Sequence, residues 1–271
     1  CFVGCNNIIK ITFEEGSNLK TIEKSGIVVC DNLEEIYFPD SLETLNVDSI
    51  KLCQKLHTIR LSNNLKNFTN EIFSSCFNVK KYIVDNENKY LQEINNNIYT
   101  IDEKTIIAAL DNNEIFELSN DVERIGTYAF SNNNKIKEFI SNDSLRIIDD
   151  YAFSNAKKLV KITLPKTINY LGEAVFKDCL SLKEITIPEN IFFLPENTFC
   201  NCKSLKKVTL PNSLIELDTS VLYHCNHLKE IILGSKIEKI KFNASTHLPS
   251  LSKIIIPTEN PYFIFFNNTL Y

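Results

Sequence analysis

Residues 182–188 have the sequence LKEITIP, and residues 205–211 have the nearly identical sequence LKKVTLP. The second segment begins 23 residues after the first. Each alternates apolar and polar side chains, as a half-buried strand does, and each ends in a proline, which lacks the N–H needed to continue a ladder. Because a segment copied at a fixed spacing is typical of repeat architectures, the period of the chain is the first property to establish.

The same 23-residue spacing extends outward over most of the chain. The apolar residue that opens each unit forms two runs: Leu19, Leu42 and Leu65, then Val122, Leu145, Ile168, Ile191, Leu214 and Ile237. From each opening residue, apolar side chains recur at offsets 3, 8, 11, 14, 17 and 19, where only Asn133, Ser141 and Ser245 are polar. One coil cannot bury such a row, but stacked coils can, because each packs on its neighbours. The sequence therefore predicts a solenoid with a parallel β ladder.

The other half of each unit has a different character. Residues 173–176 have the sequence EAVF, in which a small residue precedes a phenylalanine, and this predicts a short turn or 3₁₀ segment. The full unit follows the pattern Leu-x-x-Ile-x-x-x-Ala-Phe-x-x-Cys-x-x-Leu-x-x-Ile-x-Leu-Pro. It resembles the BspA-like leucine-rich repeats, also called the Treponema pallidum type, over essentially the whole chain. The resemblance implies a leucine-rich-repeat solenoid.

The repeat spacing breaks between Leu65 and Val122, where residues 90–94 (YLQEI), 98–101 (IYTI) and 105–110 (TIIAAL) alternate with turns at 95–97 and 102–104. This predicts a β-meander island, which is either a structural spacer packed on the ladder or a binding protrusion. Residues 260–271 align without gaps on 88–99, so we expect the chain to end inside a second island. The predicted organisation is repeats over 1–85, starting within a unit, the island over 86–118, six repeat units over 119–257, and a truncated island over 258–271.

Stacking turns repeat offsets into columns of side chains. Offset 16 alternates in sign through Glu138, Lys161, Glu184, Lys207 and Glu230, which indicates a device that fixes strand register, with a ligand-binding stripe as the alternative. Lys183, Lys206 and Lys229, at offset 15, form a basic line beside it, and Thr163, Thr186 and Thr209 lie at offset 18. We expect these columns to form an exposed, concave strand face. Flat faces of this kind suit protein or glycan partners better than small substrates, so they are the candidate interaction face.

The nine cysteines do not form a disulfide framework, because seven of them share one inward slot: Cys5, Cys30, Cys53, Cys76, Cys179, Cys202 and Cys225. Cys200 with Cys202, His224, Cys225 and His227 is the nearest approach to a zinc motif, but its spacing matches no familiar zinc finger. No Ser or Cys has a His and an acidic partner in an adjacent column, and no glycine-rich phosphate loop occurs. We predict no catalytic site, no metal site and no cofactor.

Composition excludes two further classes. The net charge is −5 with no basic block, which argues against nucleic-acid binding. The longest apolar runs, 106–110 and 263–266, are far too short to span a bilayer, and no targeting signal is visible at the start. Sequons mark Asn67, Asn142, Asn243 and Asn267 as candidate N-glycosylation sites if the protein is exported from a eukaryotic cell.

Function is inferred from the long repeat surface without a catalytic constellation. This indicates a non-enzymatic interaction module. The family resemblance implies a secreted or cell-surface protein whose partners are host matrix proteins, other cell-surface proteins or glycans, and hence adhesion. The alternative hypothesis is an intracellular scaffold for protein assembly.

Overall fold

The computed structural model describes residues 2–66, 68–73, 75–110, 112–241, 247–263, 265–266 and 269–270. The chain divides into two compact units, Cys1–Asp111 with Gly126–Ala129, and Asn112–Ile125 with Phe130–Tyr271. Both consist of short strands joined by turns, and the described residues include only two 3₁₀ segments and no α-helix. Parallel strands with 23-residue register confirm the predicted solenoid.

Unit 1 stacks its strands in three parallel ladders, β1-β4-β7, β2-β5-β8-β9 and β3-β6, followed by the antiparallel meander β10-β11-β12. Its elements are β1 (Phe2–Val3), β2 (Lys10–Ile11), β3 (Thr21–Ile22), β4 (Ile27–Val28), β5 (Glu35–Tyr37), β6 (Thr44–Leu45), β7 (Ile50–Lys51), β8 (Thr58–Arg60), η1 (Asn70–Phe73), β9 (Lys81–Ile83), β10 (Leu91–Ile94), β11 (Asn97–Thr100) and β12 (Thr105–Ala109). The meander follows the predicted strands within a residue or so. The division of the chain at 85, 118 and 257 stays a prediction.

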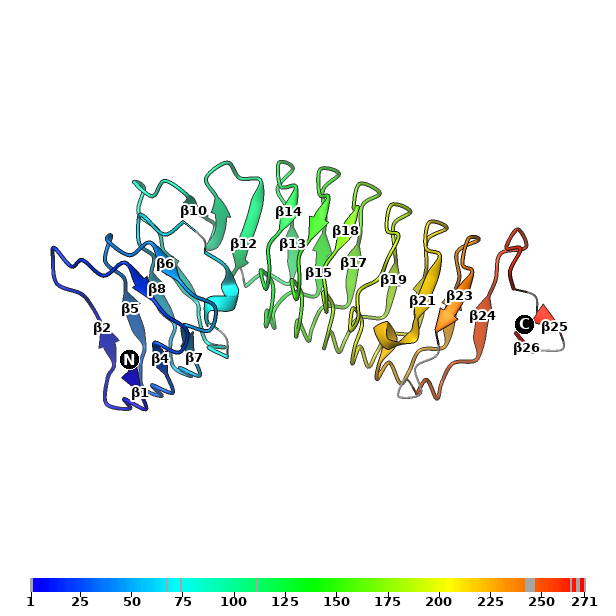
Figure 1. Cartoon of the computed structure of the whole chain (residues 1–271), viewed down its shortest axis with the longest axis horizontal. Helices are drawn as coiled ribbons and strands as arrows, with labels where there is room; N and C mark the ends of the chain where they lie inside the picture. The colour runs from blue at the N-terminus through cyan, green and yellow to red at the C-terminus, as the bar shows by residue number, and fades with distance from the viewer. Residues whose placement is uncertain are drawn as a thin grey trace. The chain divides into compact units, whose positions relative to one another are not determined.

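Unit 2 has two series of parallel strands (Figure 1). The strands of one series have three residues each and pair as β13-β15-β17 and β19-β20-β22-β24. Those of the other series have two or three residues and pair as β14-β16-β18 and β21-β23. The elements are β13 (Ile115–Glu117), β14 (Arg124–Ile125), β15 (Glu138–Ile140), β16 (Ile147–Ile148), β17 (Lys161–Thr163), β18 (Tyr170–Leu171), β19 (Glu184–Thr186), β20 (Lys207–Thr209), β21 (Glu216–Asp218), η2 (Thr219–Leu222), β22 (Glu230–Ile232), β23 (Lys239–Lys241), β24 (Lys253–Ile255), β25 (Phe265–Phe266) and β26 (Thr269–Leu270).

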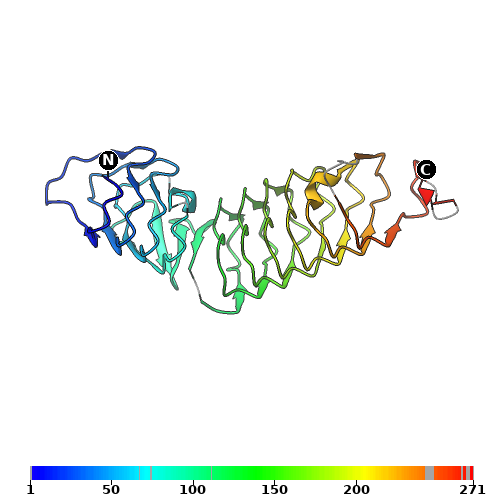
Figure 2. The ribbon, with the colours of Figure 1, turned by 90° about the horizontal axis from the view of Figure 1, so that it is seen from below.

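The coils of unit 2 follow one another side by side (Figure 2), and equivalent side chains of successive coils stack in the interior. Phe153, Phe176 and Phe199 are fully buried, and their ring centroids are 5.6 and 5.7 Å apart with nearly parallel planes. Neighbouring coils are hydrogen-bonded beside these rings, for example from Phe176 N to Thr198 O at 2.9 Å. The repeat period alone therefore determines which rings touch.

The turns of unit 2 use left-handed backbone at one fixed offset. Asn132, Asn155, Asp178, Asn201 and His224, which lie 23 residues apart, all have φ near +60°. Asn and Asp tolerate this region better than most residues, because their short side chains hydrogen-bond locally. This accounts for solenoid turns built with little glycine.

Candidate functional site

The candidate interaction face is called here the long-strand face. It consists of the outward side chains of β13, β15, β17, β19, β20, β22 and β24 and of the residue directly before each of these strands. In β17 and β19 the middle residues, Ile162 and Ile185, are buried while the residues on either side are exposed. The alternation is the expected pattern of a strand with one face on the core. It places the predicted residues of offsets 16 and 18 on the surface.

Charges on this face pair along the stack. Lys161 Nζ lies 2.6 Å from Glu138 Oε1, and Lys207 Nζ lies 3.3 Å from Glu230 Oε1. Lys253 also reaches Glu230, at 3.6 Å. Glu184 lies in register with Lys207 but makes no ion pair within the described residues. Since exposed pairs contribute little each, the column resembles a register device more than a source of stability; that role stays a prediction.

The neighbouring basic line is not neutralised in the same way. Lys183, Lys206 and Lys229 are all exposed, and none forms an ion pair with another described residue. They are bridged through the backbone, with Lys206 N donating to Lys183 O at 2.7 Å and Lys229 N to Lys206 O at 2.9 Å. Three equivalent lysines on successive coils therefore concentrate unpaired positive charge along one line.

Threonines complete the face. Thr163 and Thr186 are exposed and Thr209 is half-buried, and Thr186 and Thr209 are direct neighbours in the β19–β20 pair. Together these residues form a shallow, mixed polar surface. It can contact an extended partner, but the arrangement contains no nucleophile with a positioned base.

The cysteine slot is interior, as the sequence predicts. The thiols of Cys179, Cys202 and Cys225 donate to the carbonyl oxygens of Phe153, Phe176 and Phe199, respectively, at 3.2, 3.1 and 3.0 Å. Each bond links a coil to the one before it. Burial raises the pKa of all three thiols, to about 12 for Cys225. They act as small, neutral core side chains.

The sequence predicts no metal site, and the positions of the possible metal ligands in the described part of the chain can be compared with what an ion requires. No group of three or more His, Cys, Asp or Glu side chains there is placed to hold a metal ion. The eight described cysteines are free thiols, and burial also raises the pKa of Cys200. Within the same residues, no helix has the length and apolar character of a membrane span.

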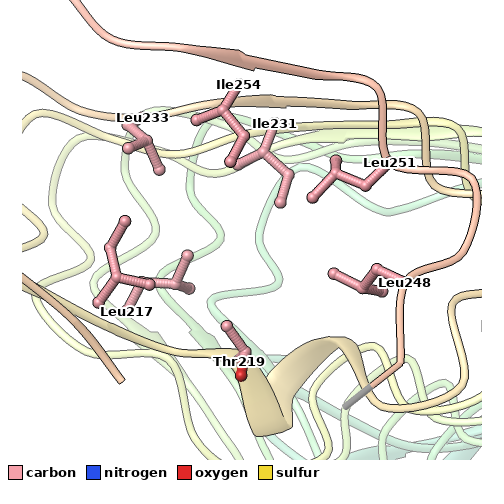
Figure 3. A pocket seen from close by; sticks show the side chains of 8 residues that line it. Leu217, Thr219, Ile231, Leu233, Leu248, Leu251 and Ile254 are labelled. Atoms are coloured by element: carbon pink, nitrogen blue, oxygen red, sulfur yellow. The ribbon is translucent and has the colours of Figure 1, made fainter. Parts of the chain in front are cut away.

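A cavity of about 200 Å³ lies between the last coils of unit 2 (Figure 3). Leu217 and Thr219 line one side, Ile231 and Ile254 the other, and Leu248 and Leu251 the end. Thr219 is the only polar residue of the described lining, and its hydroxyl already donates to Lys241 O at 3.1 Å. The described lining is therefore almost wholly apolar.

Of the predicted glycosylation sites, only Asn142 lies within the described residues; Asn67, Asn243 and Asn267 lie outside them. Asn142 is only 7% exposed. Its Nδ2 donates to Val122 O at 2.9 Å and also to Ser119 O, and its Oδ1 accepts from the amides of Ser144 and Leu145. A glycan on this nitrogen of the folded chain would require those bonds to open, and use of the site stays a prediction.

The sequence analysis missed the short-strand face, defined here by the outward side chains of β14, β16, β18, β21 and β23 and of the turns joining them. The opening segment of every repeat of unit 2 except the one that begins at Ile191 forms such a strand, and partners 23 residues away supply its hydrogen bonds. Arg124 binds Asp149 here with two bonds, Nε to Oδ2 at 2.6 Å and a terminal nitrogen to Oδ1 at 2.9 Å. This contact raises the pKa of Arg124. The same offsets also carry Phe192 and Phe193, an aromatic pair at positions that are polar in most other units.

Comparison with known proteins agrees with this architecture. The family model for the BspA type leucine rich repeat region matches residues 1–100, 100–222 and 172–269, so the chain belongs to that family. No curated protein sequence matches the chain.

Three crystal structures resemble the chain over most of its length. The pneumococcal vaccine antigen PcpA has a TM-score of 0.70 at 20% identity, with 93% of this chain and 78% of PcpA covered. A leucine rich cell surface protein from Faecalibacterium prausnitzii has a TM-score of 0.67 at 20% identity, covering 90% and 76%. A leucine-rich repeat protein from Eubacterium ventriosum has a TM-score of 0.67 at 14% identity, covering 98% and 88%. At these identities the likeness establishes the fold alone.

Proposed function

We propose that the chain is a non-enzymatic adhesion module that binds host matrix proteins, other cell-surface proteins or glycans through its long-strand face. Leucine-rich repeat proteins generally mediate protein interactions, and this chain belongs to that class. The observation that carries the proposal is the line of Lys183, Lys206 and Lys229, exposed on consecutive coils without ion-pair partners among the described residues. An acidic protein segment or a sulfated glycan complements such a line.

Location outside the cell is part of the proposal. The likeness to PcpA, a vaccine antigen, and to a bacterial cell surface protein supports it. Antibody labelling of intact cells, compared with permeabilised cells, tests it. Labelling only after permeabilisation would favour the intracellular scaffold instead.

Binding is tested by charge reversal. The variant Lys183→Glu, Lys206→Glu, Lys229→Glu is compared with the native chain by surface plasmon resonance against fibronectin, laminin, collagen and heparin. We expect binding to at least one of these to weaken about tenfold or more, and the native affinity to fall as salt rises, because the contact is electrostatic.

A matched control reverses the same number of charges elsewhere. Lys157, Lys158 and Lys203 are exposed on turns away from the long-strand face, and their reversal to Glu produces the same net charge. We expect this control to retain most of the affinity. Equal weakening in both variants would mean that only net charge matters, and unchanged binding of the first variant would place the site on another face.

A further inference from the structure

The coil that contains Ile191 differs from its neighbours on the short-strand face. Phe192 is 70% exposed and Phe193 67% exposed, the two largest exposures among the described large apolar side chains. In most other units the position of Phe192 is polar: Lys20, Glu43, Lys66, Glu123, Arg146, Asn169 and Glu238. The phenylalanine pair is therefore a departure from the repeat that packing in the core does not explain.

Apolar neighbours enlarge this feature into a patch. Tyr170, one coil before, occupies the repeat position of Phe193 and is 49% exposed, while Ile215, one coil after, occupies the position of Phe192 and is 50% exposed. The pairing of β19 with β20 and of β20 with β22 makes these three coils consecutive. We call Tyr170, Phe192, Phe193 and Ile215 the aromatic patch. Contiguous exposed apolar patches of more than a few hundred Å² are rare on monomeric proteins and commonly mark interaction sites.

The backbone ladder is interrupted at the same place. In the preceding coil, Asn169 N donates to Arg146 O at 2.9 Å and Gly172 N to Ile148 O at 2.8 Å. In the coil of Ile191, the amides of Phe192 and Phe193 make no such bonds within the described residues, and Pro195 has no N–H to offer. The ladder resumes only further on, where Glu238 N donates to Ile215 O at 2.8 Å. The two phenylalanines of the patch thus lie on a segment that the short-strand sheet does not incorporate, next to Tyr170 in β18.

The rest of this coil is firmly held. Its strand β20 pairs on both sides, and Phe199 N donates to Val221 O at 2.9 Å. Phe199 itself is fully buried in the aromatic stack. The exposed rings are therefore presented from an ordered framework, which lowers the entropic cost of binding to them.

Charge around the patch selects the partner. Residues 185–202 contain no Lys or Arg but include Glu189 and Glu196. Glu216, in the next coil, is already paired with Lys239 and Lys241. Glu189 and Glu196 flank the phenylalanines in the same coil and are exposed. Two copies meeting patch to patch would bring these acidic side chains together, which disfavours self-association. A partner with cationic side chains gains both ion pairing and contact with the aromatic ring faces.

We infer that the aromatic patch is a second interaction surface, which binds a protein segment that alternates apolar side chains with Lys or Arg. The patch lies on a different face from the basic line of the proposed adhesion surface. It favours basic partners, whereas the basic line favours acidic ones. The chain therefore has two binding faces of complementary electrostatic character.

The test uses a short fluorescein-labelled peptide in which Leu and Phe alternate with Lys and Arg. A second peptide replaces each basic residue with Glu, and a third replaces each apolar residue with Ser. We expect the full chain to bind the first peptide about tenfold or more tightly than either of the others by fluorescence anisotropy. Phe192→Ser with Phe193→Ser should lower that affinity about tenfold or more.

Two substitutions serve as matched controls. Phe77 is 57% exposed in unit 1, so Phe77→Ser removes a comparable exposed ring and should leave peptide affinity unchanged. Glu196→Lys should weaken binding and reduce its salt dependence, whereas Glu117→Lys, an exposed change on the long-strand face, should do neither. Because both phenylalanines are exposed, the double variant should retain the native unfolding midpoint.

Three results would overturn the inference. The first is equal affinity of the native chain and the Phe192/Phe193 variant for the basic peptide, and the second is preference for the acidic peptide. The third is concentration-dependent self-association of the native chain in sedimentation velocity that the Phe192/Phe193 variant abolishes, which would make a second copy the occupant. None of these results depends on the matrix and heparin measurements. Each of the two proposed surfaces can therefore be refuted without refuting the other.

Discussion

The repeat coils of unit 2 and the meander of unit 1 are both β structures, but they are held together at different distances along the chain. In the coils, Glu138 pairs with Lys161 and Phe176 stacks between Phe153 and Phe199, so each contact spans one period. In the meander, β10 pairs with β11 across a two-residue turn at 95–96. Coil stability therefore depends on neighbouring repeats, whereas the β10–β11 hairpin depends largely on local turn chemistry. Strand β12 also has partners distant in sequence, since Gly126 N donates to Ile106 O at 2.8 Å.

The largest expected effect is in the aromatic stack. Phe176→Ala removes a fully buried ring between two others and should lower the free energy of unfolding by about 3–5 kcal/mol. Chemical denaturation measures this value. Hydrogen exchange should show the loss of protection concentrated in coils 153–199, since each coil contacts only its neighbours. A loss of equal size in β10–β12 would contradict the distinction between the two regions.

The turn of the meander should give the next largest effect. Asn96 has a φ of 63°, and its side-chain nitrogen donates to Lys80 O and to Leu110 O, both at 3.2 Å. Asn96→Ala should cost about 1–3 kcal/mol and expose β10–β12 to exchange, because it strains the turn and leaves two carbonyl groups unpaired. Asn96→Gly keeps the backbone freedom and loses only the side-chain bonds. If both variants match the native chain, the turn does not control the meander.

A third prediction uses pH. Folding raises the pKa of Cys225 to about 12, above the unfolded value of about 8.5, because burial disfavours the thiolate. The unfolded state therefore loses its proton first, so this contribution to stability is complete below about pH 8.5 and declines as pH rises toward 12. Between pH 8 and 9.5 the loss should be about 1 kcal/mol. Cys225→Ala should make the measured fall of unfolding free energy with pH shallower by this amount, while the shares of Cys179, Cys200 and Cys202 remain. Strands β10, β11 and β12 contain no cysteine, so their protection from hydrogen exchange should not show this decline with pH.

The smallest expected effect is in the charged column. Glu138→Lys should lower stability by a few tenths of a kcal/mol, and by less at high salt, because the pair with Lys161 is exposed to solvent. The exchanged pair, Glu138→Lys with Lys161→Glu, should recover most of the loss in denaturation experiments. Failure of the exchange to recover stability would mean that the column does not act through neighbouring pairs.

Most of the fold could be predicted because each unit repeats the same physical constraint. The apolar offsets predicted the buried row, and the inward position of Cys179, Cys202 and Cys225 followed from their shared slot. The short-strand face was missed because a two-residue strand such as β18 carries no periodicity of its own. The patch at Phe192 and Phe193 was missed because the sequence was compared only at positions that are alike in all units, and these two residues differ from their equivalents.

The sequence by itself determined the period, the residues that face the interior and the order of strands, since hydrophobic burial acts on every unit alike and stacking propagates it. Only the tertiary structure decided which surface charges pair, as Lys161 does with Glu138. It likewise decided which have no ion-pair partner among the described residues, as is the case for Lys183, Lys206 and Lys229. It also decided that the ladder opens at Pro195 and leaves two phenylalanines in solvent. Such choices depend on distances between coils, and a one-dimensional pattern of side chains does not contain them.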